Sequence, residues 1–336
     1  MPNLFTATII ILPLQNVNRY GTIPPNENEI ATYDVAEMKG KRCKMAKFKD
    51  SKSIYYIGIV FVILVWSLFP VVTKNLFNLY TPSLWDTAGS LIAVISLAIL
   101  SRKKLKLLNM SYFKVAVPTG VFFSAACLLQ KFGLTISTPA MFSFLENTSC
   151  IIVPLLMMVF VREKMTPMKL LSAMVCLVGV FVLCCGKGGI RFGLGEFLCA
   201  LAGVCYSVNI AGTGAFARKL DTGLYLMIQF AVHFVISLGY SIVFVEEWNF
   251  SFAPQHLIAL VGIVLVSTVL CWGIRTACLK KLDPSFVAVA MPFTAVFTGI
   301  ESILAGTDTL SLGLVAGAVL ITAAILISGL ADSKKK

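Results

Sequence analysis

One carboxylate is unusual because it lies inside a long apolar segment. Glu146 falls near the middle of the run 137–160, directly before Asn147, and helical spacing places Phe142 and Cys150 on its face. An ionisable side chain in the middle of a membrane span costs about 2.5–3.5 kcal/mol on insertion scales, so it marks a functional candidate. Such a carboxylate binds a proton reversibly or pairs with the ammonium group of a substrate. The alternative is a structural carboxylate that stays protonated or hydrogen-bonded to a neighbouring helix.

A histidine lies at the centre of another apolar run. His233 is preceded one turn earlier by Gln229 within the segment 222–245. A central histidine relays protons, or it joins helices through hydrogen bonds worth about 0.6–2 kcal/mol, and both interpretations are open. His233 and Glu146 are therefore the candidates for proton coupling. The sequence contains no HxxxH or HExxH motif, so neither a metal site nor a cofactor is expected.

Aromatic and amide side chains also fall near the middle of apolar runs. They line a cavity for an apolar or aromatic substrate, or they pack between helices and against lipid. Arg275 either extends to the membrane interface along its aliphatic stem or attracts an anionic substrate. Asp86 and Glu301, near the ends of their runs, are expected to reach headgroups or water. The candidates for substrate binding are Trp66, Gln130, Glu146, Asn147, Tyr206, Asn209, Trp272 and Phe293.

The composition excludes an ordinary water-soluble domain. Of the 336 residues, 58% are hydrophobic and only 13% are charged, and the mean hydropathy is +0.87. Soluble domains average about 45–50% apolar and about 25% charged residues, so a soluble enzyme or a nucleic-acid-binding protein is not expected. The net charge of +12 is typical of cationic loops on the cytoplasmic side of a membrane. The ten cysteines form no CxxC pair and are interpreted as small buried apolar residues.

Apolar segments separated by short polar breaks fill the chain from Ile54 onward. A span across a hydrocarbon core of about 30 Å requires about 20 such residues. Proline follows threonine or aspartate at several starts, as at Thr81-Pro82, Thr166-Pro167 and Asp283-Pro284, a position where a backbone N–H has no partner in the helix. We predict an all-α integral membrane protein with ten transmembrane helices, at 54–74, 81–100, 111–133, 137–160, 168–185, 193–215, 222–245, 256–278, 284–304 and 310–330.

The distribution of basic residues predicts the orientation in the membrane. With the N-terminus inside, 21 of the 28 lysines and arginines fall in cytoplasmic segments and 4 fall outside, which is a strong positive-inside signal. We expect a multi-pass protein of the cell (plasma) membrane with both termini cytoplasmic. Residues 1–53 are expected to form a polar, basic and disordered tail, with translation starting near Met45, and 331–336 a basic C-terminal tail.

The two halves of the chain share landmarks in the same order. An offset of 145 residues carries Pro139 onto Pro284, and an offset of 140 carries Trp66 onto Tyr206. Each half contains five spans, so the second half enters the membrane from the opposite side. Two inverted five-helix repeats indicate a substrate site between the halves and alternating access to that site. The predicted repeats are residues 54–186 and 193–330.

Several of these segments are similar to a known family. EamA-type members of the drug/metabolite transporter superfamily resemble this chain over about 54–330, in the runs Leu64–Lys74 (LVWSLFPVVTK), Ile151–Pro154 (IIVP), Arg162–Thr166 (REKMT) and Leu177–Val180 (LVGV), and at Met291-Pro292. The resemblance implies a secondary transporter, often an exporter of amino acids or other small metabolites. It also places Glu163 and Asp308 in matching turns, where a carboxylate caps the next helix. Asp308 instead of the usual glutamate and Tyr206 instead of a common tryptophan depart from the family pattern.

The sequence therefore predicts a secondary active transporter that exports a small metabolite such as an amino acid or an amphipathic amine. Because no GxxxxGK[ST] loop is present, differential binding rather than ATP must drive the cycle, and proton coupling is a further hypothesis. The alternatives are an anion exchanger of the sugar-phosphate or nucleotide-sugar type and a non-transporting membrane protein. An enzyme is not expected, because His233 has no obvious serine or aspartate partner in the sequence.

The expected partners are a small-molecule substrate and the lipid bilayer, without nucleic acid. The spacing of Gly313 and Gly317 allows the last helix to pack against the last helix of the first half, within the chain or in a homodimer.

Overall fold

The computed structural model describes residues 52–73, 80–136, 145–162, 166–185, 193–244, 249–304 and 312–333. The chain divides into units 1–50 and 51–336, and the second unit contains all of these residues. The expectations about the N-terminal tail, the start at Met45, the turn residues Glu163 and Asp308, and the last three lysines lie outside the described residues.

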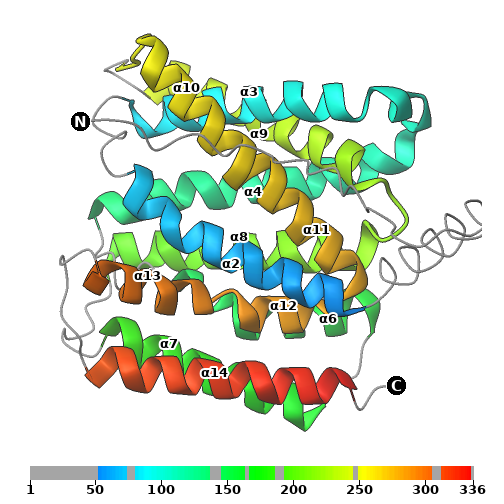
Figure 1. Cartoon of the computed structure of the whole chain (residues 1–336). Helices are drawn as coiled ribbons and strands as arrows, with labels where there is room; N and C mark the ends of the chain where they lie inside the picture. The colour runs from blue at the N-terminus through cyan, green and yellow to red at the C-terminus, as the bar shows by residue number, and fades with distance from the viewer. Residues whose placement is uncertain are drawn as a thin grey trace, which may run out of the picture. The chain divides into compact units, whose positions relative to one another are not determined.

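Every element in the described ranges is helical, apart from one isolated bridge between Tyr80 and Phe250. The first half contains α2 (Lys52–Thr73), α3 (Pro82–Leu100), the 3₁₀ segment η1 (Arg102–Leu107), α4 (Met110–Ile136), α6 (Ser149–Val161) and α7 (Pro167–Cys185). The second half contains α8 (Leu194–Phe216), α9 (Thr222–Phe244), α10 (Pro254–Ile263), the π-helical segment η2 (Val264–Leu270), α11 (Cys271–Lys281), α12 (Pro284–Ala290), α13 (Phe293–Leu304) and α14 (Leu312–Ser333) (Figure 1).

Proline marks the helix starts as predicted. Helices α3, α7 and α12 begin at Pro82, Pro167 and Pro284. Asp283 caps α12, because its carboxylate accepts a hydrogen bond from the N–H of Ser285. No side-chain cap bond from Thr81 holds the start of α3.

Seven helical segments are long and apolar enough to cross a membrane, and three shorter apolar helices accompany them in the part of the chain that the structure describes. They follow the ten predicted segments in order, because α10, η2 and α11 together make one span and α12 with α13 make another. The apolar stretches of α2, α6 and α7 are shorter than a full span within the described ranges. The all-helical membrane fold is confirmed, and the number of ten crossings stays a prediction.

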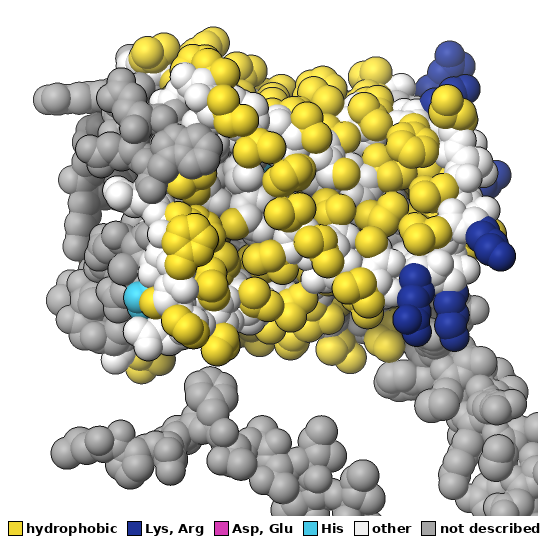
Figure 2. Space-filling model, turned by 90° about the horizontal axis from the view of Figure 1, so that it is seen from above, with side chains coloured by type: hydrophobic (Ala, Val, Ile, Leu, Met, Phe, Trp, Pro, Cys, Tyr) yellow, Lys and Arg dark blue, Asp and Glu magenta, His cyan; other side chains and the backbone are white. Residues whose placement is uncertain are grey.

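The surface between the two ends of the unit is apolar. Large hydrophobic side chains such as Val159 and Ile258 are each 73% exposed, which is typical of a surface that contacts lipid rather than water. Figure 2 shows hydrophobic side chains across the visible face, with Lys and Arg gathered at the end where α2 begins.

The helix contacts follow the symmetry of two repeats. The third span of the first half, α4, packs against the first span of the second half, α8. The equivalent contact with the halves exchanged is also present, because α11 in the third span of the second half packs against α2, the first span of the first half. The same exchange relates the pair α6 and α8 to the pair α13 and α2. Two further contacts, α3 with α9 and α7 with α14, join equivalent spans of the two halves and are unchanged when the halves are exchanged. In Figure 1 α7 and α14 lie side by side. These contacts place the interface between the halves in the interior.

Glycine allows the last helices of the two halves to pack closely. A Cβ atom added to Gly317 of α14 would lie 2.6 Å from Cβ of Leu183 and 2.8 Å from the carbonyl oxygen of Gly179, both in α7. The spacing of Gly313 and Gly317 predicted that the last helix packs within the chain or in a homodimer. The structure shows the packing within the chain, of α14 against α7.

Gly317→Ala is expected to destabilise the detergent-solubilised protein by about 1–3 kcal/mol, because the added methyl group overlaps atoms of α7. Thermal unfolding measures the effect. Gly262→Ala in α10 is the matched control, since no described atom lies within 4 Å of its added Cβ, and alanine improves helix propensity by up to about 1 kcal/mol. Equal melting temperatures for the two variants would contradict this packing.

Candidate functional site

Two apolar spans are interrupted at corresponding positions. In the fourth span a turn at Asn147–Thr148 follows Glu146 and precedes α6, so the continuous helix predicted over 137–160 is wrong. In the ninth span, Met291–Pro292 separates α12 from α13. The offset of 145 residues that relates the halves carries Glu146 onto the first residue of this second break. Interrupted spans at matching positions of two inverted repeats are the sequence feature that best marks a binding site in secondary transporters.

Local chemistry explains both interruptions. The carbonyl oxygen of Leu145 accepts from the N–H of Thr148 at 3.2 Å and from its hydroxyl at 2.6 Å, and these bonds close a turn instead of continuing the helix. Pro292 has no N–H with which to continue α12. Helix α8 approaches the first break closely, because a Cβ atom on Gly203 would lie 2.6 Å from the carbonyl oxygen of Leu145. The missing side chain of Gly203 thus allows α8 to lie beside Glu146.

Aromatic rings from both halves meet in the interior. The ring centroids of Trp66 (α2) and Trp272 (α11) lie 5.4 Å apart, and Phe123 (α4) lies 4.7 Å from Trp272. Phe123 also contacts Tyr206 (α8) at 6.4 Å and Phe230 (α9) at 5.8 Å. We call these five residues the aromatic cluster. The sequence singled out Trp66, Tyr206 and Trp272 but missed Phe123 and Phe230, because phenylalanine is common throughout the apolar runs.

Arg275 follows the second tryptophan by one turn of α11. Its side chain is 4% exposed, and its Cζ atom lies 4.6 Å from the ring centroid of Trp272 and 5.9 Å from that of Trp66. The interpretation that Arg275 extends to the membrane interface is therefore wrong. The indole N–H of Trp66 donates to the carbonyl oxygen of Ser267 at 3.0 Å in η2, a π-helical segment of the kind often found at functional sites.

Tyr206 is held by side chains of α4. Its hydroxyl donates to Oε1 of Gln130 at 2.9 Å and lies 3.3 Å from Sγ of Cys127. The offset of 140 residues carries Trp66 onto Tyr206, and the offset of 145 carries Gln130 onto Arg275. The two repeats therefore build the same arrangement twice, a ring on the first span of one half beside a polar side chain on the third span of the other.

His233 has two polar partners. Its Nδ1 lies 3.2 Å from Oγ of Ser124, and its Nε2 lies 3.7 Å from Oδ2 of Asp86. The structure supplies the serine and aspartate partners that the sequence did not indicate. Asp86, which was expected to reach headgroups or water, lies near His233 with its side chain 22% exposed. The hydroxyl of Ser124 donates to the carbonyl oxygen of Gly120 at 2.8 Å. The ring of His233 also lies 4.9 Å from that of Phe123, so the pair adjoins the aromatic cluster.

Other residues singled out in the sequence make contacts elsewhere. The side-chain amide of Asn209, which is 1% exposed, donates to the carbonyl oxygen of Thr119 at 3.0 Å. Phe293 lies 5.1 Å from Phe297 in its own helix, and Asn147 lies in the turn that forms the first break. The structure therefore does not bring Asn209 or Phe293 into the aromatic cluster.

Glu301 also differs from its sequence-based expectation. Its Oε1 accepts a hydrogen bond from the hydroxyl of Ser67 at 2.7 Å, and its Oε2 is buried. The hydroxyl of Thr298 donates to the carbonyl oxygen of Ser67 at 3.3 Å. The expectation that Glu301 reaches headgroups or water is therefore wrong, because the carboxylate joins α13 to α2.

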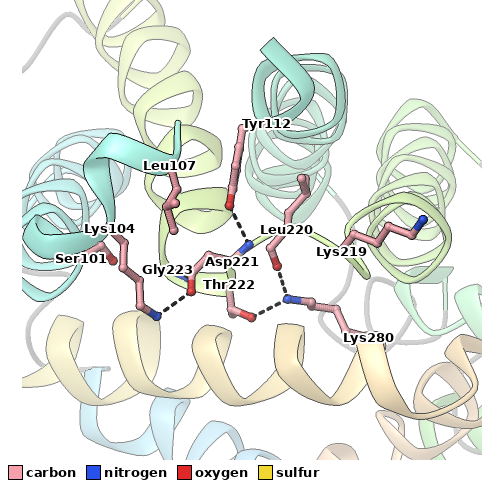
Figure 3. A pocket seen from close by; sticks show the side chains of 10 residues that line it. All are labelled: Ser101, Lys104, Leu107, Tyr112, Lys219, Leu220, Asp221, Thr222, Gly223 and Lys280. Atoms are coloured by element: carbon pink, nitrogen blue, oxygen red, sulfur yellow. Dashed lines mark hydrogen bonds and ion pairs between the residues drawn. The ribbon is translucent and has the colours of Figure 1, made fainter. Parts of the chain in front are cut away.

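A hollow with a volume of about 570 Å³ lies where η1, the α8–α9 loop and the end of α11 meet (Figure 3). In it, Nζ of Lys104 donates to Oδ2 of Asp221 at 2.6 Å, and the N–H of Asp221 donates to the hydroxyl of Tyr112 at 3.0 Å. Lys280 donates to the carbonyl oxygen of Leu220. The lining residues are Ser101, Lys104, Leu107, Tyr112, Lys219, Leu220, Asp221, Thr222, Gly223 and Lys280. None of the predicted binding residues lines this hollow, so it is separate from the aromatic cluster.

The ion pair in the hollow lies outside the spans. Burial raises the pKa of Asp221, but hydrogen bonds from Lys104 and from the N–H of Leu224 outweigh it, and the net pKa is below the ordinary value. The hydrogen bond and charge of Asp221 raise the pKa of Lys104. A lowered carboxylate pKa stabilises the folded state above the unfolded pKa of about 3.9, and this stabilisation is lost as pH falls through the folded pKa.

Asp221→Asn is therefore expected to lower the melting temperature slightly at pH 7 and to have little effect at about pH 3, below the ordinary pKa of aspartate. The effect is small because the pair is partly exposed. Asparagine keeps the oxygen that accepts from the N–H of Gly223, so the loss of charge is tested alone. Thermal unfolding between pH 3 and pH 8 measures it, and a difference that does not change with pH would contradict the ion-pair assignment.

Comparison with known proteins places this geometry in a family. One solved crystal structure superimposes with a TM-score of 0.71 at 17% sequence identity, covering 85% of this chain and 100% of that chain, which shows a shared fold. No curated protein is significantly similar in sequence. The model of the EamA-like transporter family matches residues 53–185 and again 193–330. The family resemblance is thus confirmed over both repeats, and the chain is a multi-pass membrane protein that belongs to the EamA-like transporter family.

Proposed function

We propose that this protein is a secondary active transporter that exports a small amine-bearing metabolite, such as an amino acid or a related amphipathic amine. The observation that carries the proposal is the interruption of the fourth and ninth spans at matching positions, with Glu146 at the first break. Transporters of this general design use such breaks to contact substrates, and a carboxylate adds an ionic partner for an ammonium group. The proposed site consists of Glu146, Trp66, Gln130, Tyr206 and Trp272.

The symmetry of the helix contacts supports alternating access. If the two repeats exchange their conformations, the same set of contacts opens the site on the opposite side of the membrane. The ring of Trp272 contacts those of Trp66 and Phe123, so a substrate reaches the cluster only when α2 and α11 move relative to α4. Differential affinity for the substrate and the coupling ion in the two states then drives the cycle.

Two centres are candidates for proton coupling. Glu146 lies at the first break, and His233 lies 3.7 Å from Asp86. Histidine is suited to reversible protonation because its ordinary pKa lies near neutral pH. We assign proton coupling to the pair of His233 and Asp86, and substrate binding to Glu146.

The main alternative is exchange of an anion such as a sugar phosphate. Recognition of a multiply charged anion requires several cations, and among the described residues one arginine, Arg275, lies against the aromatic cluster. We place the protein in the plasma membrane. The orientation with both termini cytoplasmic is supported by the basic side chains of the visible face, which gather at the end where α2 begins (Figure 2).

Glu146→Gln is expected to abolish export, because glutamine cannot pair ionically with an ammonium group. Metabolites inside and outside cells that express wild type, the variant or no protein identify the substrate, and counterflow in proteoliposomes then measures the loss. Glu196→Gln is the matched control: Glu196 accepts from the N–H of Gly193 at 2.8 Å at the start of α8, a bond that glutamine retains. Undiminished flux through Glu146→Gln would remove this carboxylate from the mechanism.

His233→Gln is expected to keep substrate exchange between equal pools and to lose net flux driven by an imposed pH gradient. Exchange needs only the substrate site, whereas uphill flux needs the proton. His256→Gln is the control, because His256 is the second of the two histidines and bonds to Oγ of Ser251 at 2.7 Å, away from the cluster. If the His233 variant retains pH-driven flux, the coupling proton binds elsewhere.

A further inference from the structure

The hollow of Figure 3 carries an excess of positive charge. Three lysines line it, Lys104, Lys219 and Lys280, against one carboxylate, Asp221, which leaves a net formal charge of +2. Lys104 donates to that carboxylate at 2.6 Å, so these two charges largely cancel each other. The charges that remain favour an anionic ligand, and the volume of about 570 Å³ lies within the range of small-ligand sites, about 300–1,000 Å³.

Lys280 is the cation that faces the loop between α8 and α9. It is half-buried at the end of α11, and its Nζ donates to the carbonyl oxygen of Leu220 and to Oγ1 of Thr222, the latter at 3.0 Å. In Figure 3 the ammonium of Lys219 points away from this loop. Both acceptors of Lys280 are uncharged, so neither neutralises it, and an ammonium has a third N–H to donate. A phosphate oxygen is the acceptor that gives a charge-assisted bond there.

Two hydroxyl groups in the hollow still have a hydrogen to donate. The hydroxyl of Tyr112, a residue that is 6% exposed, accepts from the N–H of Asp221 at 3.0 Å, and no acceptor takes its own hydrogen among the described residues. Ser101 is 5% exposed, and its hydroxyl has no partner within the same described ranges. Buried polar groups in native proteins are nearly always hydrogen-bonded. Both hydroxyls are therefore available to the oxygens of a bound anion.

One wall of the hollow is apolar. Leu107 lines it and is 58% exposed, and Figure 3 shows its side chain directed toward the loop that holds Asp221. Leu105 and Met110, which flank Leu107 in the chain, are exposed as well. Large apolar side chains that are exposed beside a membrane span are typical of contact with lipid. A ligand with an acyl chain next to its anionic group satisfies both parts of this surface, whereas a free phosphate satisfies only the polar part.

We propose that the hollow binds the headgroup of an anionic phospholipid from the surrounding bilayer. Lys280 and the hydroxyls of Tyr112 and Ser101 donate to the phosphate oxygens, and the acyl chains follow the apolar surface beside Leu107. Basic pockets between membrane helices on the cytoplasmic side bind headgroups of this kind. The site is separate from the aromatic cluster and does not depend on which substrate is transported.

A headgroup in the hollow would connect the two halves of the protein. Tyr112 belongs to α4 of the first half, and Lys280 belongs to α11 of the second. A ligand that contacts both is bound only while these two helix ends lie together, so it stabilises that arrangement relative to any other. The bound lipid is also expected to raise the melting temperature in proportion to the logarithm of its concentration above the dissociation constant.

Lipid binding to the purified full-length protein tests the proposal. The probes are dioleoyl phosphatidylglycerol, dioleoyl phosphatidylcholine and glycerol phosphate, and native mass spectrometry from one detergent measures their dissociation constants. Phosphatidylglycerol is expected to bind at least about tenfold more tightly than phosphatidylcholine, because the lysines repel the choline ammonium. Equal affinities for the two lipids would overturn the proposal. Glycerol phosphate that binds as tightly as phosphatidylglycerol would also overturn it, and would assign the hollow to a soluble phosphate compound.

Lys280→Gln is expected to weaken phosphatidylglycerol binding by about tenfold or more, because the headgroup loses a charge-assisted hydrogen bond. Glutamine still donates to the carbonyl oxygen of Leu220, so the loop is retained. Lys114→Gln is the matched control, since Lys114 is an exposed lysine of α4 that does not line the hollow. Equal losses in the two variants would show a general attraction of lipid to basic residues and would overturn the site.

Asp221→Asn is expected to strengthen phosphatidylglycerol binding by about threefold or more, because it removes the carboxylate that repels the phosphate and releases Lys104. A gain of affinity cannot come from misfolding, so this variant tests the site even where the loss in Lys280→Gln is open to that explanation. An unchanged or lower affinity would overturn the proposal. None of these measurements involves transport, so their outcome is independent of the proposed function.

Discussion

A helix that stops inside a membrane exposes backbone N–H and C=O groups that lipid cannot satisfy, and the interior of this protein depends on how two such stops are accommodated. At the first stop, the hydroxyl of Thr148 donates a hydrogen bond to the carbonyl oxygen of Leu145, and α8 packs closely against this turn at Gly203. At the second, Pro292 has no N–H with which to continue α12, and the N–H of Thr294 donates to the carbonyl oxygen of Met291 at 3.0 Å as the next helix begins. One turn along α8 from Gly203, Tyr206 donates to Gln130 of α4 and so adds a polar contact between the halves.

The fold is symmetric but its charges are not. Glu146 in the first half corresponds to Met291 in the second, and Arg275 in the second half corresponds to Gln130 in the first. Each half therefore contributes one ion, of opposite sign, to a position where the other half is neutral. A ligand that contacts residues of both halves has a binding energy that depends on how the halves are arranged. Such dependence is what a ligand needs in order to shift a conformational equilibrium.

Local rules predicted the helices and their order, since Pro82 and Pro284 mark starts that need no tertiary context. The sequence did not reveal which faces meet. Membrane helices are apolar all round, so no stripe of periodicity distinguishes a buried face from a lipid-facing one. Asp86 and His233 come from different helices, and only packing brings them together. Arg275 is buried for the same reason, because its neighbour Trp66 comes from the first helix of the other half.

The pair of His233 and Asp86 adjoins the aromatic cluster through one side chain, Phe123. Phe123 packs against both His233 and Trp272, so movement at one centre is transmitted to the other by contact. Packing thus links the pair of His233 and Asp86 to the tryptophans of α2 and α11.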